Sequence, residues 1–212
     1  MAAIRVLLAD DHTIVAEGLA VLLRPHFELL GTVRDGRSLV QSAIKLRPDV
    51  IVTDISMPLL NGLEAVRQVK NQLPRTKVIV LTMHAEPEMA VQAFRAGAAA
   101  YLLKISSGEE LVRAVREVSQ GRAYLSPLIT SDLISIMIEA RGDSAVRRPK
   151  LSPRQVEVLQ LVAEGRTMKE VAAILHISPR TAETHKYGMM EILGVKTTAA
   201  LIQYALRLKI VA

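Results

Sequence analysis

The sequence predicts an α/β doubly wound five-stranded parallel sheet that is followed by a small all-α domain of four helices. Two observations lead to this fold class. Up to about residue 121, short aliphatic runs alternate with segments whose apolar residues recur at helical spacing. From Leu151 onward the spacing is helical throughout. Because parallel strands need crossover connections, the alternation in the first part predicts helices on both faces of one parallel sheet.

The expected elements of the first part follow one another in strand-helix order. The run Val50–Val52 shows no polar alternation, which is typical of a strand covered on both faces. Gly97 is expected to end the fourth helix, because glycine readily adopts the left-handed conformation found after helices. The predicted strands are residues 4–9, 29–33, 50–53, 77–81 and 98–103, and the predicted helices are residues 13–23, 37–46, 62–72, 87–96 and 107–120.

Composition limits the possible classes of function. The chain has 212 residues, half of them hydrophobic, and no cysteine, which excludes disulfides, thiolate catalysis and zinc fingers. Residues 1–125 carry 15 Lys and Arg against 13 Asp and Glu, whereas residues 126–212 carry 12 against 8. This excess fits an anionic partner for the second part, although a small excess is usually only a solvated surface. No run approaches the roughly 20 apolar residues needed to cross a membrane, so we expect a cytoplasmic protein with no membrane partner.

Polar residues that could form a site follow the predicted strands at residues 4–9, 50–53, 77–81 and 98–103. The carboxyl ends of parallel strands meet at one edge of the sheet, where ligands bind. The residues expected there are Asp10, Asp11, Asp54, Thr82 and Lys104. Clustered carboxylates favour a hard cation such as Mg²⁺, while a hydroxyl and an ammonium suit phosphate oxygens. An isolated Asp after a strand is more often a turn or cap residue, but this group indicates phosphoryl transfer to Asp54.

In residue type, order and spacing, this set resembles the receiver domain of bacterial two-component response regulators. The resemblance covers about residues 1–121 and implies a flavodoxin-like fold. The resemblance implies that Asp54 accepts a phosphoryl group from a sensor histidine kinase. It also implies that Mg²⁺ is held by the carboxylates of Asp10, Asp11 and Asp54 and the backbone carbonyl of Ser56.

The same resemblance gives roles to the polar residues of the fourth and fifth strands. Thr82 and Lys104 would bind the phosphoryl oxygens. Tyr101 would turn inward when Thr82 moves toward the phosphoryl group, but it equally fits plain core packing. His84 is expected to be exposed rather than catalytic, in a position from which it could tune the access of water.

The two parts are joined by residues 122–149. Ser126 and Pro127 form the cap and first turn of a predicted linker helix that extends to Ala140. Residues 141–150 contain almost no large apolar residues, so a flexible tether is expected there. The predicted domains are therefore residues 1–121 and residues 150–212.

The second part predicts helices at residues 153–163, 167–175, 179–193 and 198–208. A short second helix, the turn His176–Ser178 and a longer third helix make a helix-turn-helix, whose third helix would enter the DNA major groove. The stretch LSPRQVEVLQLVAEGRTMKEVAAILHISPRTAETHKYGMMEILG resembles the DNA-binding domain of LuxR-type regulators. Together with a receiver, this resemblance indicates a transcription regulator of the NarL/FixJ class.

The third of these helices has an apolar face and a polar face. Ala182, His185, Met189 and Leu193 share the face expected to pack inward. Base edges are expected within reach of Glu183, Thr184 and Tyr187. The DNA backbone is expected to contact Lys169, Arg180, Thr181, Lys186 and Lys196. A face for a symmetric dimer is expected on the last helix, from Ala199, Ile202, Tyr204, Ala205 and Leu206, part of which must also close the domain.

The function indicated is a DNA-binding response regulator, not an enzyme in its own right, whose receiver assists only its own phosphotransfer and autodephosphorylation. Its expected partners are a histidine kinase, double-stranded operator half-sites, a second copy of the chain and RNA polymerase. Two alternatives stay open from the residues. One is a phosphatase that uses Asp54 as nucleophile. The other is an adaptor whose second domain binds protein, which is favoured only by the unusual Met168 and Gly188.

Overall fold

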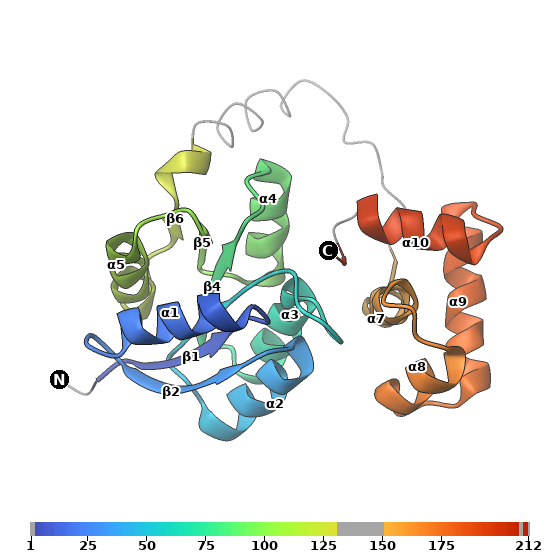
Figure 1. The fold of residues 1–212 in the computed structure, drawn as a ribbon, viewed down its shortest axis with the longest axis horizontal. Helices are drawn as coiled ribbons and strands as arrows, with labels where there is room; N and C mark the ends of the chain where they lie inside the picture. The colour runs from blue at the N-terminus through green and yellow to red at the C-terminus, as the bar shows by residue number, and fades with distance from the viewer. Residues whose placement is uncertain (1–2, 131–150, 208–209, 212) are drawn as a thin grey trace. The chain divides into compact units, whose positions relative to one another are not determined.

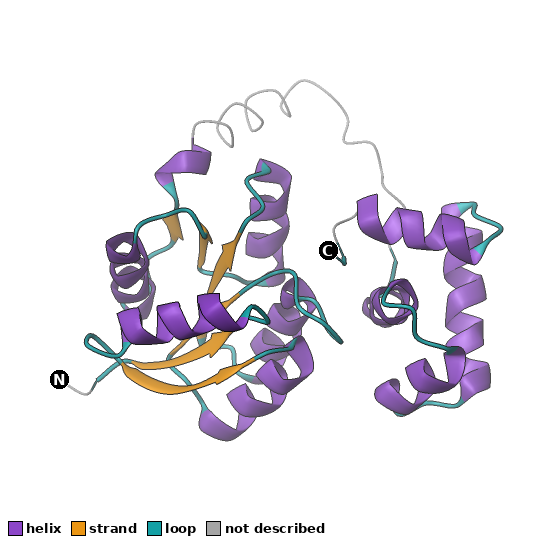
Figure 2. Ribbon diagram, viewed as in Figure 1, coloured by secondary structure: helices purple, strands orange, loops and turns teal. Residues whose placement is uncertain are grey.

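The computed structural model describes residues 3–130, 151–207 and 210–211. These residues form two compact units, a sheet unit on the N-terminal side of the chain and a helical unit on the C-terminal side. Figure 1 labels the elements of both units, and Figure 2 shows that strands occur only in the first of them within the described residues.

The sheet unit is built on parallel strands in the order β2-β1-β3-β4-β5-β6. The strands are β1 (Arg5–Ala9), β2 (Glu28–Val33), β3 (Val50–Thr53), β4 (Lys77–Thr82), β5 (Ala100–Leu103) and β6 (Tyr124–Leu125). Every residue of β3 is buried, as its unbroken apolar sequence predicts. The fold class is therefore confirmed, with a doubly wound parallel sheet whose central strands lie in the interior.

Helices cover both faces of this sheet (Figure 2). They are α1 (Thr13–Leu23), α2 (Gly36–Leu46), α3 (Gly62–Gln72), α4 (Pro87–Ala96) and α5 (Gly108–Ser119). Helix α1 packs against α5, whereas α2 packs against α3 and α3 against α4. Gly97 ends α4 with φ of +105°, as expected for a residue in the left-handed region.

The short strand β6 was not predicted. It pairs with β5 through hydrogen bonds from the Tyr124 N–H to the Ala99 carbonyl and from the Ser126 N–H to the Tyr101 carbonyl, both 3.0 Å long. The four residues after Ser126 are helical, in agreement with the predicted cap and first turn. The rest of the predicted linker helix and the predicted tether lie outside the described residues.

The helical unit contains α7 (Pro153–Ala163), α8 (Met168–Leu175), α9 (Pro179–Leu193) and α10 (Thr198–Arg207). Its first two helices begin with capping boxes, in which Ser152 pairs with Gln155 and Thr167 pairs with Glu170. Helices α7, α8 and α9 pack against one another, and α10 packs on α7. The core is formed mainly by Val158, Leu159, Leu161, Val171, Leu175, Ala182, Met189, Leu201 and Ala205.

The predicted dimer face on α10 is only partly available. Ala205 is fully buried in the core of the helical unit, whereas the Leu206 side chain is 48% exposed. Part of the apolar surface of α10 therefore closes the domain, as expected from the sequence. Within the described ranges, we find no helix with both the length and the apolar character that crossing a membrane requires.

Candidate functional site

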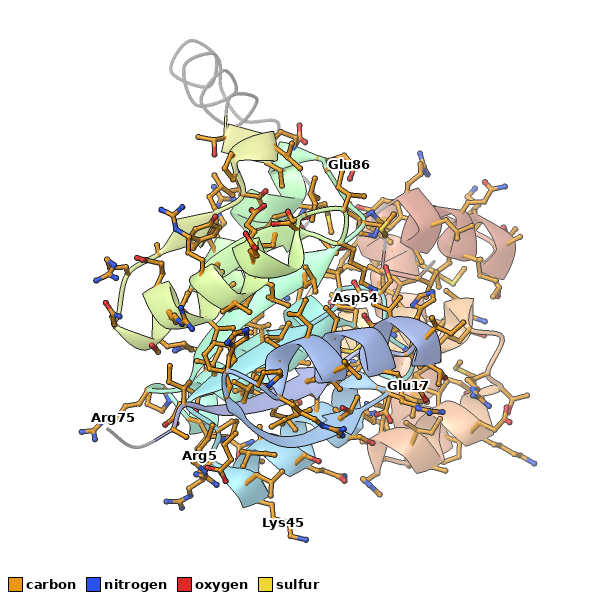
Figure 3. All side chains as sticks on the ribbon, turned by 60° about the vertical axis from the view of Figure 1, so that its left-hand side comes forward. Arg5, Glu17, Lys45, Asp54, Arg75 and Glu86 are labelled. Atoms are coloured by element: carbon orange, nitrogen blue, oxygen red, sulfur yellow. The ribbon has the colours of Figure 1, made fainter. Side chains whose placement is uncertain are left out.

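The predicted polar residues of the sheet unit meet at the carboxyl edge of the sheet. Ala9 pairs with Thr53, which places Asp10 beside Asp54 at the ends of β1 and β3. Thr82 pairs with Leu103, so Lys104 follows directly next to Thr82 on the neighbouring strand. Figure 3 places Asp54 at the end of the sheet opposite Arg5, the first residue of β1. The strand-end rule thus predicted the neighbours correctly.

Hydrogen bonds hold both the backbone and the side chain of Asp54. Its backbone N–H donates to the Ala9 carbonyl at 2.9 Å. One carboxylate oxygen accepts from the Ile55 N–H at 2.6 Å, and the other accepts from Lys104 Nζ at 2.7 Å. The residue is only 4% exposed. The Asp54 carboxylate is thereby held in one orientation at the carboxyl edge of the sheet, in direct contact with the Lys104 ammonium group.

Lys104 connects two acidic residues. Its Nζ lies 2.7 Å from Asp54 Oδ2 and 2.8 Å from Asp10 Oδ2. Burial acts to lower the pKa of the Lys104 ammonium, but hydrogen bonds to Asp10 and Asp54 and the charges of both carboxylates outweigh it and raise the pKa. Lys104 is therefore a charged group that neutralises part of the acidic site and is within reach of any group attached to Asp54.

The acidic residues form a cluster that fits a divalent cation. One ligand atom from each of Asp10, Asp11, His12 and Asp54 lies within 4.8 Å of all the others. Asp11 Oδ1 is buried and accepts no hydrogen bond, although His12 Nδ1 lies 3.0 Å away, so this oxygen has capacity left for a cation. Three carboxylates with one unsatisfied oxygen are the donor set that hard divalent ions prefer.

Ser56, whose backbone carbonyl was predicted as a metal ligand, follows Asp54 in the loop after β3. Its hydroxyl lies 3.1 Å from Nε2 of His84. The expectation that His84 is exposed was wrong, because its side chain is only 24% exposed and faces this loop. Sequence spacing could not show this contact, since Ser56 and His84 belong to loops after different strands.

Tyr101 lies inside the sheet unit. It is fully buried, and its hydroxyl donates a 2.7 Å hydrogen bond to the backbone carbonyl of His84. Burial, and then the charge of Asp54, raise the pKa of this hydroxyl, so it stays a neutral donor. The His84 N–H in turn donates to Thr82 Oγ1 at 3.3 Å. Tyr101 and Thr82 are therefore connected through one residue of the loop between β4 and α4.

Sequence reasoning missed two residues of this site. His12 contributes an imidazole nitrogen to the cluster of possible ligands. Its position directly after Asp10 and Asp11 was a signal that could have pointed to it. Gly62, the first residue of α3, lies against the backbone of Asp54. Nothing in the sequence near Gly62 indicates that contact.

The helical unit contains the predicted helix-turn-helix. Helix α8 ends at Leu175, the next residue His176 has φ of +53° in the left-handed region, and the turn leads to Ser178. The Ser178 hydroxyl accepts from the Thr181 N–H at 3.1 Å and so caps α9. Ala182 and Met189 are fully buried, while His185 and Leu193 are half-buried. The inward face of α9 is thus the one that its apolar spacing predicts.

The predicted DNA-contacting residues lie on the accessible surface of the helical unit. Lys186 is half-buried, and the Tyr187 side chain is 64% exposed. The Thr184 hydroxyl donates to the Arg180 carbonyl at 2.9 Å, so it is engaged within α9. The remaining predicted contacts are exposed, namely Lys169, Arg180, Thr181, Glu183, Thr184 and Lys196.

Comparison with known proteins gives two family matches. Residues 6–116 match the model of the response regulator receiver domain. Residues 149–205 match the model of bacterial regulatory proteins of the luxR family. Together the two matches include the acidic site of the sheet unit and the helix-turn-helix of the helical unit.

Full-length relatives and solved structures agree with these matches. The chain is 37% identical over 205 residues to the transcriptional regulatory protein MctR of Rhizobium johnstonii, covering 96% of this chain and 93% of that protein. It is 34% identical over 213 residues to the oxygen regulatory protein NreC of Staphylococcus carnosus, covering 97% and 98%. A structure of two RcsB dimers bound to two parallel DNAs is similar at a TM-score of 0.60 and 28% identity, covering 96% and 98%.

Proposed function

Because this chain belongs to the LuxR-family response regulators, which combine a receiver domain with a DNA-binding domain, we propose that phosphorylation of Asp54 by a sensor histidine kinase controls its dimerisation and its activity as a transcription factor. One observation carries the proposal. Asp54 is the carboxylate at the centre of the strand-end site, with Lys104 Nζ at 2.7 Å and the acidic cluster around it.

The described residues suit the steps of phosphoryl transfer to a carboxylate. The hydrogen bond from the Ile55 N–H to Asp54 Oδ1 orients the nucleophile. Mg²⁺, held by Asp10, Asp11, Asp54 and the backbone carbonyl of Ser56, would neutralise charge on the transferring oxygens. The carboxylates and the unsatisfied Asp11 oxygen support such a site. The receiver would assist this transfer and its own dephosphorylation, with no other substrate.

Lys104 and Thr82 would bind the new phosphoryl group. In the structure Lys104 is shared between Asp10 and Asp54, so it needs to move little to contact an oxygen attached to Asp54. A shift of Thr82 toward the same group would disturb its hydrogen bond with the His84 N–H. Since the His84 carbonyl accepts from Tyr101, this loop would pass the change to Tyr101 and to the surface around α4 and β5.

The helical unit would bind operator DNA through α9. We assign the receiver to residues 1–121, the linker to residues 122–149 and the DNA-binding domain to residues 150–212. The exposed Arg180, Glu183 and Tyr187 would face the major groove. Phosphorylation would favour a dimer that binds two half-sites and contacts RNA polymerase. The RcsB dimers on DNA, a relative at 28% identity, support the dimeric arrangement.

Phosphorylation is tested by incubating the full-length chain with Mg²⁺ and a small phosphodonor. Intact-mass measurement should show one added phosphoryl group that is lost on acid treatment. The Asp54→Asn variant keeps the size of the side chain but removes the nucleophilic oxygen, so it should show no added mass. Labelling that persists unchanged in Asp54→Asn would end the assignment of Asp54.

A further inference from the structure

The imidazole of His12 lies beside the acidic cluster, and the function described above gives it no role. Its Nδ1 is 3.0 Å from Asp11 Oδ1 and 3.4 Å from Asp10 Oδ1. Although His12 is the N-cap residue of α1, its side chain makes no capping hydrogen bond. The side chain is 62% exposed, so local packing does not force it toward the two carboxylates. Its position fits either an ion pair with the two carboxylates or a cation shared with them.

The spacing of these atoms is that of ligands to one ion. Two ligands at right angles on an octahedral ion, with bonds of about 2.1 Å, lie about 3.0 Å apart, and opposite ligands lie about 4.2 Å apart. The separation of 3.0 Å between His12 Nδ1 and Asp11 Oδ1 equals the first of these values. The ligand atoms of Asp10, Asp11, His12 and Asp54 all lie within 4.8 Å of one another, an upper limit that is somewhat longer than the second value.

The approach of His12 to Asp11 is not a hydrogen bond. Asp11 Oδ1 is buried and accepts none, even though Nδ1 of His12 is only 3.0 Å away. The contact is therefore an ion-pair approach rather than an aligned hydrogen bond. The separation of the two atoms is also that of neighbouring ligands of a shared cation.

Building on the cation site of the proposed function, we propose that Nδ1 of His12 is a further ligand in this site and makes it selective for divalent transition-metal ions over Mg²⁺. Mg²⁺ takes oxygen ligands and binds imidazole poorly. Imidazole nitrogen suits ions such as Co²⁺, Ni²⁺ and Zn²⁺, whose affinity for nitrogen and oxygen donors also exceeds that of the earlier divalent metals. Three carboxylates would bind either class, and the single imidazole would discriminate between them.

The test measures metal binding directly on the full-length chain without an affinity tag, at mildly alkaline pH. Co²⁺ serves as the transition-metal probe, because its visible absorption changes when nitrogen replaces water as a ligand. Mg²⁺ binding is measured by calorimetry on the same samples. The wild-type chain should bind Co²⁺ at least about tenfold more tightly than Mg²⁺. His12→Gln should lose about tenfold or more in Co²⁺ affinity, because loss of even an outer partner of a ligand has effects of that size. Its Mg²⁺ affinity should change less than about twofold.

Two control variants accompany His12→Gln. His26→Gln removes an exposed imidazole just beyond the end of α1 and should leave both affinities unchanged. Asp11→Asn removes a carboxylate that both ions use and should weaken both. Thermal unfolding of each variant shows that it is folded. As a measurement independent of any variant, the imidazole nitrogen resonances in the wild-type chain with added Zn²⁺ should show one histidine bound through Nδ1.

The outcomes separate this inference from the proposed function. Equal Co²⁺ affinity in the wild-type chain and in His12→Gln overturns the inference, as does an equal loss in His26→Gln. If His12→Gln instead strengthens Mg²⁺ binding and leaves Co²⁺ binding unchanged, His12 is only a charge partner of the carboxylates and the inference also fails. In each of these cases the labelling of Asp54 with Mg²⁺ is unaffected. Only a wild-type chain that binds neither ion would count against both proposals.

Discussion

Gly62 lies so close to Asp54 that a Cβ atom on Gly62 would come within 1.9 Å of the Asp54 carbonyl oxygen. The Gly62 N–H also donates to the Ile55 carbonyl at 2.8 Å. The first turn of α3 is therefore packed directly on the backbone that carries the phosphoacceptor. The φ of Gly62 does not lie in the left-handed region, so backbone conformation does not demand glycine here. Glycine is required because there is no space for a side chain.

We expect Gly62→Ala to displace this backbone and to impair phosphorylation. Forcing a methyl group into a packed site typically costs roughly 1–3 kcal/mol. The free energy of unfolding of the receiver should fall by about that amount, and labelling by a small phosphodonor should slow because the Asp54 carboxylate is no longer aligned. Denaturant unfolding and intact-mass kinetics measure the two effects. Gly18→Ala is the control, since no atom lies within 4 Å of the Cβ that it would add. Normal labelling of Gly62→Ala would contradict the expectation.

Tyr101→Phe should test the link between Tyr101 and the loop after β4. The substitution removes the hydroxyl that donates to the His84 carbonyl and keeps the aromatic ring in the core. Loss of one buried hydrogen bond should lower the free energy of unfolding by roughly 0.5–1.5 kcal/mol. If Tyr101 also transmits the effect of phosphorylation, the Tyr101→Phe variant should still be labelled on Asp54, but phosphorylation should convert less of it to the dimer. Tyr187→Phe, at an exposed position, should leave stability unchanged. Normal labelling and normal dimerisation of Tyr101→Phe would assign Tyr101 to core packing alone.

Gly188 lies inside α9, where glycine is unfavourable by about 1 kcal/mol relative to alanine. A Cβ atom there would meet only Nε2 of Gln155, at an ordinary contact distance of 3.7 Å. Gly188→Ala should therefore raise the free energy of unfolding by about 1 kcal/mol. Gly194→Ala is the opposite control, because φ of +66° at that position strains any other residue even though nothing lies within 4 Å. Thermal unfolding compares the two variants, and a destabilised Gly188→Ala would show that glycine is needed in α9.

Gly188→Arg extends the same argument to DNA. The position is four residues after Thr184, at the edge of the surface assigned to DNA. An added phosphate contact should tighten operator binding and steepen the salt dependence of the affinity by about one unit of slope. Titrations at several salt concentrations measure this slope, with Gly188→Ala as the matched variant without charge. An unchanged slope would place residue 188 away from the DNA backbone.

Phosphorylation is expected to favour a dimer that binds two half-sites separated by about one helical turn of DNA or a multiple of it. Sedimentation with and without a phosphate mimic should show the monomer converting to the dimer. Asp54→Asn should remain monomeric under the same conditions. A chain that is monomeric in both states and yet binds its operator fully would contradict this coupling.

Much of the fold could be predicted from the sequence because its signals are local. The aliphatic run of β3 and the helical spacing of α3 belong to single segments, and the strand-end rule then placed Asp10 beside Asp54. The strand β6 could not be found, because two residues carry no periodic pattern. The contact between Gly62 and Asp54 and the direction of the His12 imidazole depend on how segments approach in space. No spacing along the chain contains that information.

The unpredicted strand β6 places β5 between two hydrogen-bonded neighbours. On one side β5 is hydrogen-bonded to β4, which ends at Thr82, and on the other it is hydrogen-bonded to β6. The carbonyl of Tyr101 itself accepts from the N–H of Ser126, the buried residue at which the chain turns out of the sheet. A displacement of β5 would therefore be felt at Ser126, directly before the helical turn that begins at Pro127. Hydrogen bonds between neighbouring strands thus connect Thr82 at the acidic site with Ser126, where the chain leaves the sheet.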